Sequence, residues 1–235
     1  GGQYVSGDAV EPYYEDIRDA IEYAIGDPAT NEWAARRAEA GHPEPFPLKY
    51  VEIGNENFGA RYDANYKYIY NKLKAEYPQL TFLNTMGLEH AVEFDIHTDM
   101  IDPHWYVSPD FFYNNRTLFD NVPRGNYEIY VGEYATNVGV GQGNMDASLS
   151  EAVFMMSMER NSDIVKMASY APLITNDNAP NWTCNLIWQH SGEVFGRASY
   201  YVQKMFAENL PDYNIASALH SSRIDVPYNG RVGIG

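Results

Sequence analysis

The chain has 235 residues, 45% of them hydrophobic, so it is long enough to bury a substantial core and most simply forms one globular unit. Its 16 basic and 32 acidic residues give a formal net charge of −16, which opposes binding to nucleic acid or to an anionic membrane and favours a neutral substrate. The 20 tyrosines, 10 phenylalanines and 4 tryptophans suit a sugar-binding cleft, although an aromatic-rich core accounts for them equally well.

Signals for a cellular compartment are few. Cys184 is the single cysteine, so no intrachain disulfide can form and the chain carries no redox signal. No apolar run reaches the length of a membrane span, and the residues from Gly1 onward show no signal-peptide pattern. That start does not resemble a natural N-terminus, so the localisation is left open, with secretion or the periplasm favoured.

Apolar residues at helical spacing mark several segments. Thr30 is a candidate cap for a short helix, and Ser148-Leu-Ser-Glu151 has the form of a capping box. The first segment has a proline near its start and a glycine after its end, as helices commonly do. The expected helices cover residues 11–25, 30–40 and 62–73, a segment that starts at Ser148, and residues 198–210.

Apolar runs of strand length fall between these helices. In the first run the period of two separates the apolar side chains from Glu52 and Glu56, and in the third it places His104 and Tyr106 on one face. The expected strands cover residues 50–58, 81–86, 100–106, 128–133 and 166–174. Strands that alternate with helices predict an α/β fold with a parallel sheet.

Two of these strands carry a glutamate at their end. Glu56 follows Asn55, and Glu133 follows Gly132, which permits a close approach of the backbone. Two carboxyl groups so placed can supply the acid/base and the nucleophile that cleave an acetal; the alternative is that they are solvated strand ends. Glu52 lies deeper and fits a buried charge with a partner better than it fits a catalyst.

No cofactor or metal is expected from the sequence. The six histidines show no metal-binding spacing such as H-x-x-x-H. The glycine-rich loop over residues 139–143 lacks the lysine of a phosphate-binding loop and lies away from the end of the preceding strand.

Six motifs occur in a distinctive order and spacing: Gly-His-Pro-Glu-Pro-Phe (41–46), Lys-Tyr-Val-Glu-Ile-Gly-Asn-Glu-Asn (49–57), His-Trp-Tyr (104–106), Tyr-Val-Gly-Glu-Tyr-Ala (130–135), Ser-Tyr-Ala-Pro-Leu (169–173) and Ser-Tyr-Tyr-Val-Gln (199–203). Together they resemble the α-L-arabinofuranosidases of glycoside hydrolase family 51. The resemblance runs from about residue 11 to residue 210.

The resemblance implies a retaining glycosidase on a (β/α)8 TIM barrel, which releases terminal α-L-arabinofuranosyl residues from hemicellulose or oligosaccharides without a cofactor. It makes Glu56, on the fourth strand, the acid/base and Glu133, on the seventh, the nucleophile. The substrate-binding residues that it implies are Asn55, His104, Tyr106, Asn176, Trp182 and Asn185. Each of these could instead have a structural role in the core or in loop packing.

Compared with that barrel, the chain supplies only the fourth to eighth strands. Residues 1–210 are then a partial catalytic barrel, and residues 211–235 are a linker and a β-strand remnant of a C-terminal β-sandwich. An incomplete barrel has two open sheet edges, which predicts aggregation or a partner such as a second chain that supplies the first three strands. The chain is therefore expected to be a fragment that needs this partner for activity.

Two other functions stay open. Another retaining barrel glycosidase, such as an endoglucanase or xylanase, would share the two-glutamate chemistry. A fragment that binds sugar without cleaving it belongs to a different class. Activity on nitrophenyl arabinofuranoside, compared with cellulose and xylan, separates the first alternative, and calorimetry with arabinose separates the second.

Overall fold

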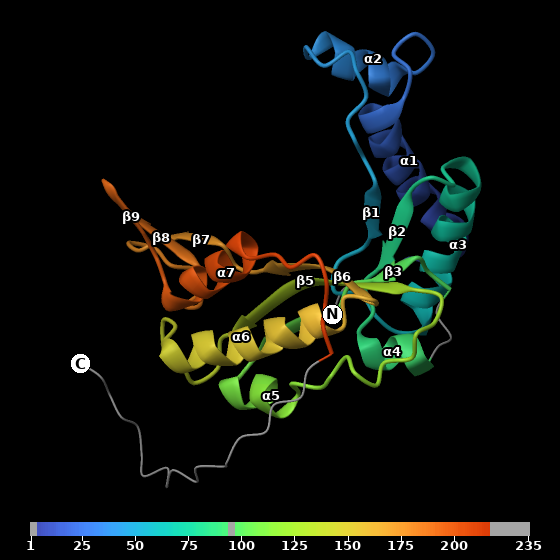
Figure 1. Ribbon diagram of the computed structural model, residues 1–235. Coiled ribbons are helices and arrows are strands. Elements are labelled where there is room, and N and C mark those ends of the chain that lie inside the picture. The colour runs from blue at the N-terminus through green and yellow to red at the C-terminus, as the bar shows by residue number, and fades with distance from the viewer. Residues whose placement is uncertain (1–3, 94–96, 217–235) are drawn as a thin grey trace, which may run out of the picture.

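A computed structural model of the protein describes residues 4–93 and 97–216. It has an α/β architecture, in which a six-stranded parallel sheet is flanked by helices and a three-stranded sheet lies in the C-terminal half (Figure 1). Most of the expected β-rich tail, from residue 217 to 235, lies outside the described residues. None of the described helices combines the length and apolar character needed to cross a membrane.

The elements alternate between helix and strand along most of the chain, as the sequence predicts. In chain order they are η1 (Gly7–Val10), α1 (Glu11–Ile25), α2 (Glu32–Glu39), β1 (Tyr50–Ile53), α3 (Ala60–Glu76), β2 (Thr81–Asn84), α4 (Leu88–Glu93), β3 (Met100–Ile101), β4 (His104–Val107), α5 (Pro109–Asn114), β5 (Glu128–Thr136), α6 (Met145–Arg160), β6 (Val165–Tyr170), β7 (Ile174–Asn176), β8 (Ile187–His190), β9 (Glu193–Gly196) and α7 (Ala198–Glu208).

The larger sheet has the strand order β1-β2-β3-β5-β4, and β6 pairs with β5. All of these pairings are parallel. Strands β3 and β4 follow one another and pair with successive parts of β5. Because the carboxyl ends of parallel strands meet at one edge, side chains distant in the sequence come together there.

One expected strand is divided in two. The run over residues 100–106 forms β3 and β4, separated by Asp102 and Pro103. Proline has no backbone N–H to donate to a sheet ladder, which explains a break at this position. His104 and Tyr106 both lie on β4 and still share one face, as the period of two predicts.

Two helix starts also differ from the sequence prediction. Asn31, not Thr30, caps α2, because its side chain accepts hydrogen bonds from the backbone N–H groups of Trp33 and Ala34. Asn144 caps α6 through the N–H of Ala147. The predicted capping box at Ser148 is wrong, because Ser148 lies inside the helix and donates to the carbonyl of Asn144.

The predicted last strand is also shorter than expected. Strand β6 ends at Tyr170, and a cis peptide bond between Ala171 and Pro172 follows. The chain then forms β7, which pairs in parallel with β8, while β8 and β9 are antiparallel. This small sheet carries no strong periodic signal in the sequence and was not predicted.

Helices α1 and α2 rise from the body as an arm (Figure 1). Arg37 of α2 is fully buried there, and its guanidinium donates to the backbone carbonyls of Tyr23, Gly26, His42 and Pro43 at 2.8–3.1 Å. The fixed fork of a guanidinium suits several acceptors at once. Arg37 therefore ties the end of α1 to the proline-rich loop that leads into β1.

Aromatic rings fill the space between the larger sheet and α6. Phe154 of α6 is fully buried and lies in contact with four other rings. Its ring centroid is 4.4 Å from that of Phe112, 5.4 Å from Trp105 and 5.7 Å from both Phe119 and Tyr134. Since two of these residues belong to β4 and β5, the cluster fixes α6 behind these neighbouring strands.

We expect Phe154→Ala to lower the free energy of unfolding by about 3–5 kcal/mol, because it removes a buried ring from a close-packed cluster. Urea unfolding followed by circular dichroism measures this loss. Met156→Ala on the same helix is the control, since Met156 is 58% exposed and its truncation should change stability by no more than about 0.5 kcal/mol. Equal effects of the two changes would contradict the assignment of this cluster to the core.

Candidate active site

Glu56 reaches the site from a turn and not from a strand. Strand β1 ends at Ile53, so the predicted alternation does not extend to Glu56. Glu56 has φ of 50°, and among the described residues it is the one non-glycine with positive φ. Thr85 holds this turn, because its hydroxyl accepts from the N–H of Asn57 at 3.0 Å and donates to the carbonyl of Asn57 at 3.1 Å. Such strain at a chemically capable side chain is typical of functional sites.

Glu133 lies within β5, which continues to Thr136, and not at the end of the strand as predicted. Its carboxylate nevertheless lies close to that of Glu56. A carboxylate oxygen of Glu56, a carboxylate oxygen of Glu133 and a ring nitrogen of His104 all lie within 4.8 Å of one another. The predicted convergence of the two glutamates is therefore present. Carboxyl groups this close suit a retaining glycosidase, whose two groups are about 5–5.5 Å apart, better than an inverting one, where they are about 6.5–9.5 Å apart.

Two residues of β4 contact these carboxylates. The hydroxyl of Tyr106 donates to Oε2 of Glu133. His104 is paired with Glu133 in the register of β4 and β5. Its Nδ1 lies 3.1 Å from Oε1 of Glu56 and 3.8 Å from Oε2 of Glu133, so one ring nitrogen faces both carboxylates.

His104 is held between acidic groups on both sides. Its Nε2 lies 3.0 Å from Oδ2 of Asp102, a carboxylate that is only 3% exposed. Burial by itself lowers the pKa of His104, but hydrogen bonds to Asp102 and Glu56 and the charges of Asp102 and Glu133 outweigh it and raise this pKa to about 9. The imidazole is then protonated at neutral pH and can donate from both nitrogens.

The same three groups are close enough to hold a cation, a possibility that the spacing of histidines in the sequence could not reveal. Both ring nitrogens of His104, however, already face carboxylate acceptors. The geometry therefore supports a proton-sharing network.

Glu52 has the partner that its position predicted. As a whole residue it is exposed, but its carboxyl end lies beside the buried carboxylate of Asp102. Burial of that end, the charge and hydrogen bond of Asp102, and the charge of Glu133 raise the pKa of Glu52 to about 7, against a smaller lowering by His104. Asp102 is the residue that sequence reasoning missed, and Pro103 inside an expected strand was the available signal.

The structure brings some of the predicted substrate-binding residues to this site. The ring of Trp182 lies 4.8 Å from that of Tyr106 and is 43% exposed, so a flat apolar surface adjoins the carboxylates. Asn55 precedes Glu56 and is exposed. Asn176 accepts from Asn178 in its own turn, and Asn185 is buried. Among the hydrogen bonds of the described residues, neither of these two contacts the carboxylate of Glu56 or Glu133.

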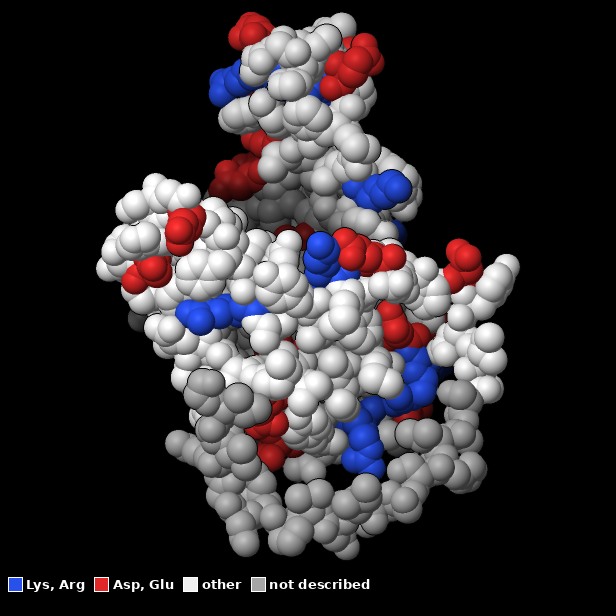
Figure 2. Space-filling view, turned by 60° about the vertical axis from the view of Figure 1, so that its left-hand side comes forward, with Lys and Arg blue, Asp and Glu red and all other residues white. Residues whose placement is uncertain are grey.

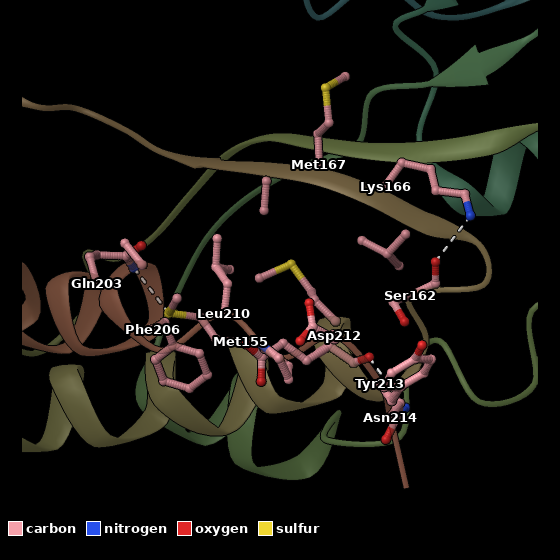
Figure 3. Close-up of a pocket in the computed structure, with 16 residues that line it drawn as sticks. Met155, Ser162, Lys166, Met167, Gln203, Phe206, Leu210, Asp212, Tyr213 and Asn214 are labelled. Carbon is pink, nitrogen blue, oxygen red and sulfur yellow. Dashed lines mark hydrogen bonds between the residues drawn. The ribbon is translucent and has the colours of Figure 1, made fainter.

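The space-filling view shows acidic side chains set back in a hollow beneath the α1–α2 arm (Figure 2). A different cavity, of about 490 Å³, lies between α6, β6 and the residues that follow α7 (Figure 3). Its lining is largely apolar and includes Met155, Phe206 and Leu210, but neither Glu56 nor Glu133. We therefore assign the chemistry to the carboxylate site.

Comparison with known proteins agrees with this geometry. Residues 1–124 match the family model of the alpha-L-arabinofuranosidase 1 domain, and residues 114–231 match that of the alpha-L-arabinofuranosidase C-terminal domain. The chain is 38% identical over 234 residues to the extracellular exo-alpha-L-arabinofuranosidase of Streptomyces chartreusis, across 94% of this chain and 28% of that protein. It is 40% identical over 202 residues to alpha-L-arabinofuranosidase 2 of Arabidopsis thaliana, across 85% of this chain and 30% of that one.

A solved structure of arabinose-bound MgGH51 α-L-arabinofuranosidase superposes with a TM-score of 0.79 at 36% identity, and covers 89% of this chain and 36% of that one. Two facing carboxyl groups at this separation are the arrangement that retaining glycoside hydrolases use. The chain belongs to the α-L-arabinofuranosidases of glycoside hydrolase family 51. It spans between a quarter and a third of the length of these curated relatives.

We expect Glu52→Gln to change how stability depends on pH. The pKa of Glu52 is raised from 4.5 to about 7 in the folded chain, so between these two pH values the folded chain holds a proton on Glu52 that the unfolded chain has lost. The contribution of Glu52 to the free energy of unfolding is therefore complete below pH 4.5 and is lost as the pH rises to 7. The stability of Glu52→Gln relative to the parent should therefore increase with pH across this window. Water reaches the side chain, which makes the effect smaller than full burial would give.

Urea unfolding at pH 4.5, 6 and 8 measures this difference. Glu193→Gln, at an exposed position on β9, is the control for the loss of one carboxylate. A difference between the Glu52→Gln chain and its parent that stays constant with pH would contradict the proximity of Glu52 and Asp102.

Proposed function

We propose that this chain carries the catalytic carboxyl pair of a retaining glycoside hydrolase that releases terminal α-L-arabinofuranosyl residues from hemicellulose or oligosaccharides. The observation that supports this most is the convergence of Glu56 and Glu133, with carboxylate oxygens within 4.8 Å, at a site that also holds Tyr106 and His104. Family membership and the arabinose-bound relative favour an arabinofuranoside over glucan or xylan as the substrate.

In the first step Glu133 attacks the anomeric carbon, and protonated Glu56 gives its proton to the departing oxygen. In the second step Glu56 removes a proton from water, which displaces Glu133 and releases the sugar. Tyr106 donates to Oε2 of Glu133 and holds this oxygen in place. When the other oxygen of Glu133 forms the covalent bond to the sugar, Oε2 becomes the carbonyl oxygen of the ester and can keep a weaker hydrogen bond from Tyr106.

His104 is suited to supply the proton that Glu56 needs. At 3.1 Å, Nδ1 of His104 and Oε1 of Glu56 can share one proton. With this proton Glu56 acts as the acid. Once the proton has left with the departing alcohol, Glu56 is a carboxylate and acts as the base toward water, and the proton that it takes from water can then be shared with His104 again. The charge of Glu133 nearby favours a proton within this pair, because it disfavours a second bare carboxylate.

Substrate binding is proposed for six residues. Trp182 offers a flat apolar face beside Tyr106 for the sugar ring. Asn55 precedes Glu56 in the same turn and is exposed, so its amide can reach a sugar hydroxyl next to the reacting carbon. His104 and Tyr106 lie against the carboxyl groups of Glu56 and Glu133, and Asn176 and Asn185 are assigned from the family resemblance.

We further propose that the parallel sheet corresponds to the fourth to eighth strands of a (β/α)8 barrel, with β3 and β4 together as the sixth. Residues 1–210 are then part of the catalytic barrel, and residues 211–235 begin a β-sandwich. In the described part of the chain, β1 pairs only with β2 and β6 only with β5, so each leaves one edge without a strand. Strands from elsewhere in the protein or from a second chain would pair with these edges.

Glu133→Gln should lower the rate of hydrolysis of 4-nitrophenyl α-L-arabinofuranoside by about 10⁴-fold or more, because an amide cannot form the glycosyl-enzyme. The assay uses this chain both alone and together with a chain that bears the remaining barrel strands. Glu193→Gln is the matched control on β9 and should keep the parent rate. Loss of activity in both variants, or in neither, would contradict the role of Glu133.

The effect of Glu56→Gln on the rate of hydrolysis should depend on the leaving group. With a poor leaving group, such as the alcohol of an arabino-oligosaccharide, the rate should fall by about 10²–10⁴-fold. With 4-nitrophenolate the first step needs little protonation, so the second step becomes limiting, and added azide should restore turnover with formation of arabinosyl azide. Equal losses on both substrates without an azide effect would exclude Glu56 as the acid/base.

The same preparations separate the rival functions. Hydrolysis of cellulose or xylan in preference to arabinofuranosides would indicate an endoglucanase or xylanase. Binding of arabinose by calorimetry, with no turnover even after the remaining strands are added, would indicate a sugar-binding fragment.

A further inference from the structure

The strand that carries Glu133 contains an extra residue beside it. Ile129 and Glu133 of β5 are four residues apart, but their partners on the neighbouring segment, Ile101 and His104, are only three residues apart. On the other side, the three steps from Val131 to Tyr134 are paired with two on β6. Strand β5 is therefore bulged next to Glu133, and a bulge redirects the side chain that follows it and leaves a backbone group unpaired.

Asp102 fills the gap that this bulge creates. The backbone N–H of Gly132 donates to Oδ1 of Asp102 at 2.6 Å, so a side chain replaces the missing strand partner. Asp102 reaches this position because the break at Pro103 leaves it outside β3 and β4. A Cβ at Gly132 would collide with both carboxylate oxygens of Asp102, which explains why a glycine precedes Glu133.

The second oxygen of the same carboxylate holds His104. Oδ2 of Asp102 accepts from Nε2 of His104 at 3.0 Å, and Nδ1 of that ring faces Glu56 and Glu133. One buried carboxylate thus links the backbone beside one catalytic glutamate to the imidazole that contacts the other. Carboxylates that accept from a histidine fix its tautomer and the orientation of its ring.

Among the described residues, the positive group that contacts Asp102 is His104. The titratable groups around the pair are Glu52 from β1, Glu56 from the turn after β1, Tyr106 from β4 and Glu133 from β5. A buried carboxylate among so many acids is costly unless it is hydrogen-bonded and paired. The hydrogen bonds that Asp102 accepts from Gly132 and His104 meet this condition.

We propose that Asp102 is a positioning residue that sets the geometry of both catalytic glutamates, through the bulge at Gly132 for Glu133 and through His104 for Glu56. It does not touch the substrate. The effect of Asp102 on catalysis rests on the proposed function, whereas its contacts with Gly132 and His104 can be tested without any substrate.

The substitution Asp102→Asn separates the two tasks. The amide oxygen can still accept from Gly132, whereas the amide nitrogen would face Nε2–H of His104 and give it no acceptor. Titration of His104, followed by long-range ¹H–¹⁵N spectra of the imidazole in the whole chain, should show its pKa fall by at least about one unit from about 9. Asp177→Asn is the matched control, because Asp177 pairs with His190 at 2.8 Å and its loss should leave His104 unchanged.

Gly132→Ala tests the same link from the backbone side and serves if Asp102→Asn does not fold. The new methyl displaces Asp102, so the His104 pKa should fall in the same direction. Gly192→Ala is the control, since a Cβ there meets no atom within 4 Å. In the unsubstituted chain Nε2 of His104 should carry a proton at pH 7. An unprotonated Nε2, or a His104 pKa that is unchanged by both variants, would overturn the proposal.

The catalytic consequence is measured on the active assembly with 4-nitrophenyl α-L-arabinofuranoside. Asp102→Asn should lower kcat by about 100-fold with little change in KM, because small misplacements of catalytic groups have effects of this size. A parent-like kcat together with an altered His104 pKa would overturn the positioning role while leaving the glycosidase function intact. If the unsubstituted assembly itself shows no hydrolysis, the proposed function fails, and the His104 titration still decides whether Asp102 holds the ring.

Discussion

The site depends on one electrostatic constraint, which is that a single imidazole lies among several acids. Nδ1 of His104 faces Glu56 and Glu133, and its Nε2 faces Asp102. Carboxylates this close repel one another when all are ionised, and a protonated imidazole between them compensates for that repulsion. The raised pKa values of His104 and Glu52 are two consequences of this arrangement, because each group keeps a proton that lowers the local negative charge. A proton shared by His104 and Glu56 is also what an acid/base residue requires.

Three irregularities of the backbone make this arrangement possible. Glu56 has positive φ in a turn, Pro103 divides one strand into β3 and β4, and β5 is bulged beside Glu133. Regular strands would direct these side chains by simple alternation, whereas here the turn, the break and the bulge accompany carboxylate oxygens of Glu56 and Glu133 that lie within 4.8 Å of each other. The aromatic cluster around Phe154 packs behind β4 and β5 and supplies the rigid support that such departures need.

The chain contains the two facing glutamates, Glu56 and Glu133, but spans only 28–30% of the curated relatives described above. Their positions on β5 and on the turn after β1 mean that one sheet presents the two carboxyl groups. The exposed face of Trp182 lies next to Tyr106 and so adds a flat apolar surface beside these carboxyl groups.

The sequence by itself determined the class of fold and the order of most helices and strands. Periodicity was sufficient for α1 and α3, and the motifs around Glu56 and Glu133 were sufficient to single out the two glutamates that the structure brings together. It could not place the Asn144 cap, because Asn144 and Ser148 are both good capping residues, nor the β7–β9 sheet, which is too short and irregular for a periodic signal. The role of Asp102 came only from the tertiary structure. Its contacts with Gly132 and His104 depend on a bulge and a strand break, and register between distant strands is set by packing across the sheet and not by local sequence.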